Sequence, residues 1–202
     1  MLGLIWGVVG TIASTFASAL VVGSDIFLKV STALTAFANT LGVIDEKDPE
    51  RLGNKIIQAE EEGIKPEKYE KYEDYMKEIG EFEIDEEKSK EIDKNEKLLR
   101  GTDAAAKVIE SKFPEHDVTG FMTSVALSDE NKKYFASDSF KEILNEVKDN
   151  PDVIDSLSKL LHGKDMSEQE YYDVIDRLST IEKRLDPSKS ESEIAERLRS
   201  LG

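Results

Sequence analysis

The stretch that decides the fold class is residues 150–185, NPDVIDSLSKLLHGKDMSEQEYYDVIDRLSTIEKRL. Its apolar residues recur three and four positions apart, which is the spacing of one face of an α-helix. Asn150-Pro151 is typical of a helix start, and Ser167 with Glu170 has the pattern of a capping box. Two helices are predicted, and the residues expected to face inward on the second are Tyr171, Val174, Ile175, Leu178, Ile181 and Leu185.

The surrounding residues 102–202 carry similar signals of helix starts and ends. Thr102 is expected to cap a helix that Pro114 ends, and a further helix is expected over about 118–127. Asp138 is expected to cap the next helix, and the run from Ser188 to Glu191 to form another capping box. Because the alternation typical of strands is nearly absent, the predicted fold is all-α, with residues 102–202 as a small acidic helical bundle.

The composition narrows the classes of function. The 202 residues include 43 Asp and Glu against 27 Lys and Arg, a net charge of −16 that would repel nucleic acid. The absence of cysteine excludes thiolate metal sites and a cysteine nucleophile, and the two histidines, His116 and His162, are expected to be structural. No catalytic or phosphate-binding motif is present, so we expect a protein that is not an enzyme and has no catalytic, cofactor or metal site.

The charge is unevenly distributed along the chain. Residues 1–44 contain one acid, Asp25, and one base, Lys29, so the net negative charge lies beyond them. We therefore predict three segments: an apolar helical head (1–44), a charged helical connector (45–101) and the helical bundle (102–202).

The head begins with an uncharged run over residues 2–23, long enough as a helix (roughly 33 Å) to span a membrane. This length predicts a transmembrane helix. Small residues recur three or four positions apart in it, so they would form one stripe where two helices approach closely. The predicted association face consists of Gly3, Gly7, Gly10, Ser14 and Ser18.

A second apolar run covers residues 26–44, and its pattern predicts an amphipathic helix with Ser31, Thr35 and Asn39 nearer the polar face. Ser24 is the expected N-cap, so the head is predicted to be an antiparallel hairpin or one long helix. Ala17-Ser18-Ala19 resembles a signal cleavage site, but no base precedes Lys29. We therefore expect a retained segment, which is not typical of a secreted protein.

The connector contains three tyrosines at helical spacing, Tyr69, Tyr72 and Tyr75, in a helix expected to begin near Pro66 and to end at Gly80. They are interpreted either as a docking face or as a half-buried face that covers the rest of the molecule.

Two functions remain open from the sequence. The first is a membrane-associating or membrane-inserting protein that self-associates as a homo-oligomer through the small residues of its head. The alternative is a structural or cargo component of a large assembly, such as a phage tail or injection apparatus, with residues 1–44 buried against other subunits. The expected partners are accordingly membrane lipid or other subunits, and the expected location is a membrane or a large particle.

Overall fold

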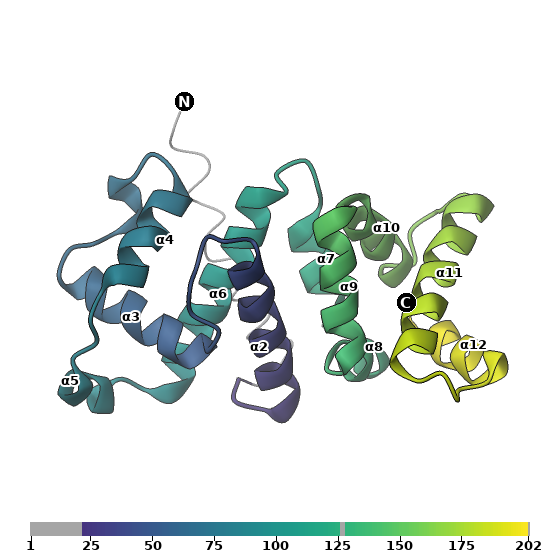
Figure 1. Ribbon diagram of the computed structural model, residues 1–202, viewed down its shortest axis with the longest axis horizontal. Helices are drawn as coiled ribbons and strands as arrows, with labels where there is room; N and C mark the ends of the chain where they lie inside the picture. Colours follow the sequence, from purple (N-terminus) through teal and green to yellow (C-terminus); the bar gives the residue numbers. More distant parts are fainter. Residues whose placement is uncertain (1–21, 126–127, 202) are drawn as a thin grey trace. The chain divides into compact units, whose positions relative to one another are not determined.

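The computed structural model describes residues 22–125 and 128–201, and every regular element in these ranges is helical, with no strand (Figure 1). The chain divides into two compact units, Met1–Lys112 and Phe113–Gly202, and each is described by itself. The prediction of an all-α fold is therefore confirmed for the described ranges.

Unit 1 is built around α6, against which α3 and α2 pack most extensively. In Figure 1, α2 lies alongside α6, and α3 crosses it. The elements of this unit are α2 (Asp25–Thr40), α3 (Pro49–Glu61), the 3₁₀ turn η2 (Pro66–Lys68), α4 (Tyr72–Glu81), α5 (Glu86–Glu91) and α6 (Lys94–Lys112).

Two glycines allow α3 and α6 to cross at backbone distance. A Cβ atom at Gly53 would lie 1.7 Å from the carbonyl oxygen of Lys97, and one at Gly101 would lie 1.8 Å from that of Pro49. No side chain fits at either place, because both positions face a neighbouring backbone. Gly101 lies within α6, at the point where this helix crosses α3.

The prediction that Thr102 caps a helix is wrong. The Asp93 carboxylate accepts hydrogen bonds from the backbone N–H groups of Asn95 (2.9 Å) and Glu96 (3.2 Å), so α6 begins well before Thr102. The Thr102 hydroxyl lies inside the fold, 2.9 Å from the Ser31 hydroxyl.

The single helix expected from Pro66 to Gly80 is also interrupted, since α4 begins only at Tyr72.

The second apolar run forms α2, and Ser24 caps it as predicted by accepting a hydrogen bond from the Phe27 N–H (3.2 Å). Its face containing Ser31 and Thr35 was expected to be the more polar one, but both side chains are fully buried. α2 is therefore amphipathic, but its exposed face is formed by Asp25, Lys29, Thr32 and Thr40, whereas Ser31 and Thr35 belong to the buried part.

No helix in residues 22–125 or 128–201 has both the length and the apolar character needed to cross a membrane. The prediction of a transmembrane helix is therefore wrong for the described residues, where the apolar helix α2 has 16 residues, about 24 Å of helix against about 30 Å of hydrocarbon. Most of the run over residues 2–23, in which that helix was expected, lies outside the described residues. The predicted association face at Gly3, Gly7, Gly10, Ser14 and Ser18 lies outside the described residues.

Unit 2 packs its helices around an aromatic centre. Phe121, Phe135 and Phe140 contact one another with ring centroids 5.3–6.3 Å apart. The Ser167 capping box is confirmed, and another begins at Ser190, where Ser188 had been expected. The helices are α7 (Val118–Val125), α8 (Asp129–Phe135), α9 (Asp138–Asp149), α10 (Asp152–Leu161), α11 (Glu168–Leu185) and α12 (Glu191–Arg199).

Candidate functional site

The three tyrosines singled out in the connector form one cluster in unit 1. The rings of Tyr69 and Tyr72 each lie 5.6 Å, centroid to centroid, from the ring of Tyr75. Tyr75 is 1% exposed, whereas the other two are half-buried. The cluster therefore has one core ring and two rings that reach the surface, and its use as a docking face stays a prediction.

Charged side chains from α3 and α6 surround this cluster. Glu60 pairs with Arg100, and Lys107 pairs with Asp103 (2.5 Å) and lies over the Tyr72 ring. Burial raises the pKa of the Asp103 carboxyl despite the nearby Lys107, and burial together with Asp103 raises the pKa of the Tyr72 phenol well above its usual range. The phenol stays protonated at neutral pH, so it offers no general base.

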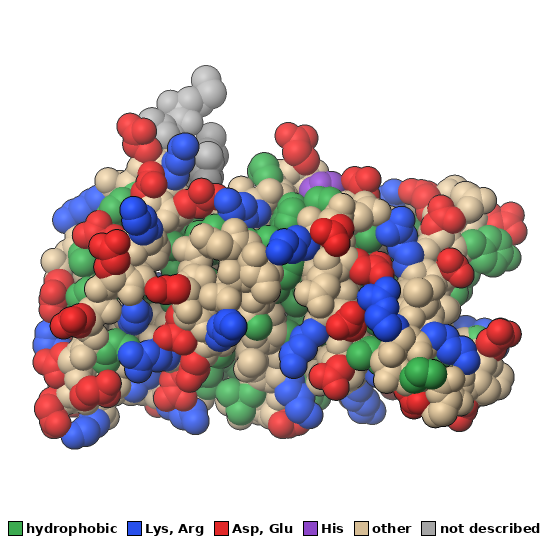
Figure 2. Space-filling view, in the orientation of Figure 1, with side chains coloured by type: hydrophobic (Ala, Val, Ile, Leu, Met, Phe, Trp, Pro, Cys, Tyr) green, Lys and Arg blue, Asp and Glu red, His purple; other side chains and the backbone are tan. Residues whose placement is uncertain are grey.

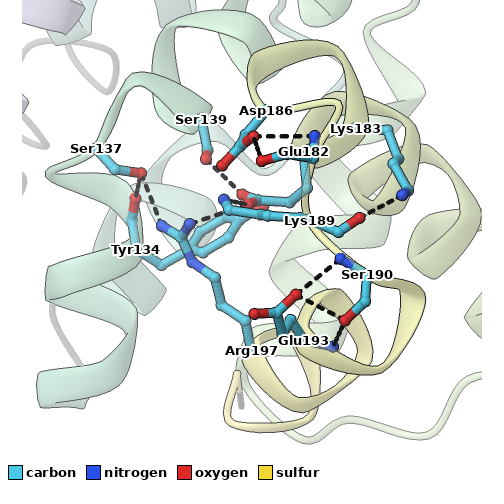
Figure 3. A network of polar contacts seen from close by, with 11 residues as sticks. Tyr134, Ser137, Ser139, Glu182, Lys183, Asp186, Lys189, Ser190, Glu193 and Arg197 are labelled. Atoms are coloured by element: carbon cyan, nitrogen blue, oxygen red, sulfur yellow. Dashed lines mark hydrogen bonds and ion pairs between the residues drawn. The ribbon is translucent and has the colours of Figure 1, made fainter.

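Unit 2 contains a fully buried carboxylate, Glu182 of α11, with partners on three sides (Figure 3). Lys189 Nζ lies 2.6 Å and Arg197 Nη1 2.9 Å from the Oε2 atom of Glu182, and the Ser139 hydroxyl donates to Oε1 (2.5 Å). Burial opposes ionisation of Glu182, but the hydrogen bonds from Lys189 and Ser139 and the Arg197 charge outweigh it and lower the pKa. Glu182 is therefore a stable anion at neutral pH.

Arg197 extends this network to α8 and to Ser137, the N-cap residue of α9. Its guanidinium carbon lies 4.9 Å from the centre of the Tyr134 ring, and Nη2 donates to the Ser137 hydroxyl (3.2 Å). In Figure 3 these groups point toward one another, and both carboxylate oxygens of Glu182 are occupied by side chains of the same chain. The arrangement connects helices and leaves no carboxylate oxygen for a substrate. Sequence reasoning missed this network, because its members are spread from residue 134 to residue 197.

The two histidines contact their own chain. His116 Nδ1 lies 2.8 Å from an Asp155 oxygen, and His162 Nδ1 lies 2.8 Å from the Ser158 carbonyl oxygen. In the described ranges, no group of three or more His, Asp or Glu residues is arranged to hold a metal ion.

No protein-family model matches the sequence, and neither a curated protein nor a solved structure shows significant similarity to it. Function must therefore be inferred from the residues and contacts of this chain.

Proposed function

We propose that this chain is a non-enzymatic helical component of a larger protein assembly, and that it self-associates through residues 1–21, which other subunits bury. The observation that carries this proposal is the way in which α2 is buried. α2 is the described half of the apolar head, and it packs on α6 and α3 of its own chain.

The contacts of α2 are those of protein packing. Phe27, Val30 and Leu34 are fully buried. The hydroxyl groups of this helix also find protein partners, since Thr35 donates to the Ser31 carbonyl oxygen (2.9 Å) and Ser31 meets Thr102. Small side chains let helices approach closely, and their hydroxyl groups can form hydrogen bonds with the neighbouring helix. Both properties suit burial by other helices.

Residues 1–21 have the same chemistry. They contain no charged side chain, and Gly, Ala, Ser and Thr alternate with large apolar residues. We propose that they form a helix antiparallel to α2, which completes the expected hairpin. Support comes from the turn before α2, where Gly23 has a φ of +80° and Ser24 caps the helix.

A non-enzymatic role is supported by the two charged clusters. The Glu182 network and the groups around Tyr72 use their ionisable side chains to bind helices of the same chain. A catalytic group needs to reach a substrate, but Glu182 and Asp103 are buried and each is paired with a cation of its own chain.

The test measures the oligomeric state of the full chain by light scattering over a range of concentrations. Gly7→Ile adds a bulky side chain to the proposed association face, whereas Ala19→Ile adds one on the opposite side of the same helix. We expect Gly7→Ile to weaken association about tenfold or more and Ala19→Ile to leave it within about twofold of wild type, because only Gly7 lies at the close approach.

Two results would overturn the proposal. One is equal association of wild type and Gly7→Ile. The other is flotation of the wild-type chain with neutral phosphatidylcholine vesicles while it stays monomeric, which would show that lipid buries the head.

A further inference from the structure

The exposed large hydrophobic side chains of the described residues all lie on one helix, α11. They are Tyr171 (40% exposed), Tyr172 (57%) and Leu185 (39%). Tyr171 and Leu185 were expected to face inward, but they lie at the two ends of the buried stripe, beyond the cover of the neighbouring helices. The rings of Tyr171 and Tyr172 contact edge to face, with centroids 5.9 Å apart.

Acidic residues surround this tyrosine pair. The segment from Asp165 to Asp176 contains five acids and no Lys or Arg. Glu170 is paired with Lys159 (2.8 Å), and the hydrogen bond from Lys159 lowers the pKa of the Glu170 carboxyl to about 2. Figure 2 shows the hydrophobic patch over the upper part of α11, at the right-hand edge, with acidic side chains around it.

The other four acids of the segment form no ion pair within the described residues. Asp173 accepts a hydrogen bond from the neutral Gln169 (2.7 Å). In the part of the chain that the structure describes, no Lys or Arg forms an ion pair with Asp165, Glu168, Asp173 or Asp176. Arg177, which follows them, is directed instead at the side-chain oxygen of Asn150 (2.9 and 3.1 Å), with that amide oriented to accept.

We propose that the surface formed by Tyr171, Tyr172, Asp165, Glu168, Asp173 and Asp176 docks an arginine- or lysine-rich segment of a partner protein. Tyrosine rings bind guanidinium and ammonium groups on their faces, and exposed tyrosines are enriched at protein interfaces. The unpaired carboxylates attract a basic segment and select against an acidic one.

The chemistry of the surface also argues against other occupants. A second copy of this chain offers no basic segment, since its net charge is −16 and it nowhere has three consecutive Lys or Arg residues. Nucleic acid would be repelled by the same carboxylates. The proposal is independent of the association through residues 1–21, because it concerns a different segment and a different partner.

The test uses a fluorescein-labelled peptide of alternating arginine and glycine, with a glutamate and glycine peptide as its counterpart, and measures anisotropy with the full chain near physiological salt. We expect the arginine peptide to bind and the glutamate peptide not to bind. Tyr172→Ala should weaken binding about fivefold or more, because the ring that receives the guanidinium is lost.

Charge is tested with two sets of four substitutions that change the net charge equally. The site set is Asp165→Asn, Glu168→Gln, Asp173→Asn and Asp176→Asn. The control set replaces exposed acids of unit 1: Glu61→Gln, Glu83→Gln, Glu86→Gln and Glu91→Gln. The site set should weaken binding about tenfold or more and the control set less than about threefold.

Equal losses in the two sets would show that only the overall charge attracts the peptide, and would overturn the proposal. Absence of binding by the wild-type chain would overturn it as well. If the site set disturbs folding, amide chemical shifts of the wild-type chain decide the question, since peptide-induced changes must concentrate at residues 165–176.

Discussion

Loss of the Glu182 charge should destabilise unit 2. A buried anion with two cationic partners leaves both cations uncompensated when its charge is lost. We expect Glu182→Gln to lower the free energy of unfolding of unit 2 by about 2–3 kcal/mol, less than for a fully buried triad, because Lys189 and Arg197 are partly exposed.

The measurement is urea unfolding of the full chain, followed by the amide signals of α9, α11 and α12. The control is Glu142→Gln, which removes a surface pair with the exposed Arg184 and should change stability by no more than about 0.5 kcal/mol. Equal effects of the two substitutions would contradict a special role for Glu182.

The lowered pKa of Glu182 also predicts that the stability of unit 2 depends on pH. The folded-state pKa values of Glu182 and Glu170 lie below the usual glutamate value of about 4.3, the latter at about 2. A lowered pKa adds stability that is present above the unfolded pKa and lost as the pH falls through the folded one. Unit 2 should therefore lose stability between about pH 5 and pH 2, and Glu182→Gln should flatten this fall in pH-dependent urea unfolding.

At the scale of elements, the crossing of α3 and α6 depends on Gly53 and Gly101. An added methyl group at either position meets a backbone carbonyl oxygen, so the two helices must separate. We expect Gly53→Ala or Gly101→Ala to cost unit 1 about 2–4 kcal/mol, despite the higher helix propensity of alanine.

The matched control for these substitutions is Gly80→Ala in α4, where the nearest atom to an added Cβ is the Asp45 carboxylate at 3.0 Å. A side chain can rotate away, so this change should be neutral or stabilising by up to about 1 kcal/mol. Thermal unfolding of the three variants measures the difference, and similar melting temperatures would refute the close crossing.

For the whole molecule, the position of the unit boundary determines which fragment folds alone. Residues 113–202 comprise one compact unit, whereas a fragment of residues 102–202 adds the second half of α6. That half carries buried Ala105, Val108 and Ile109, which would lose their cover without α2 and α3.

We therefore expect the fragment 113–202 to be monomeric, with amide chemical shifts close to those of the full chain. The fragment 102–202 should show additional association through the exposed face of α6. Sedimentation measures the association state of both fragments. If both are monomeric, the exposed face of α6 does not cause association, and the prediction is wrong.

Local signals in the sequence determined the helical class and several helix starts. Ser24 and Ser167 act on backbone groups within one helical turn, so residues three positions away suffice to recognise them. The second capping box shows the limit of such signals. Ser188 and Ser190 both have a glutamate three residues later, but Ser188 is hydrogen-bonded to Asp186, so α12 starts from Ser190.

The tertiary structure decided the features that depend on distant residues. Thr102 suggested a helix start, yet it lies inside α6, which Asp93 caps, and its hydroxyl packs against Ser31 of α2. Likewise the partners of Glu182 and the burial of Ser31 on α2 follow from which helices meet, and that is set by packing over the whole unit. A pattern of spacing shows which residues share a helix face, but only the folded chain determines what covers that face.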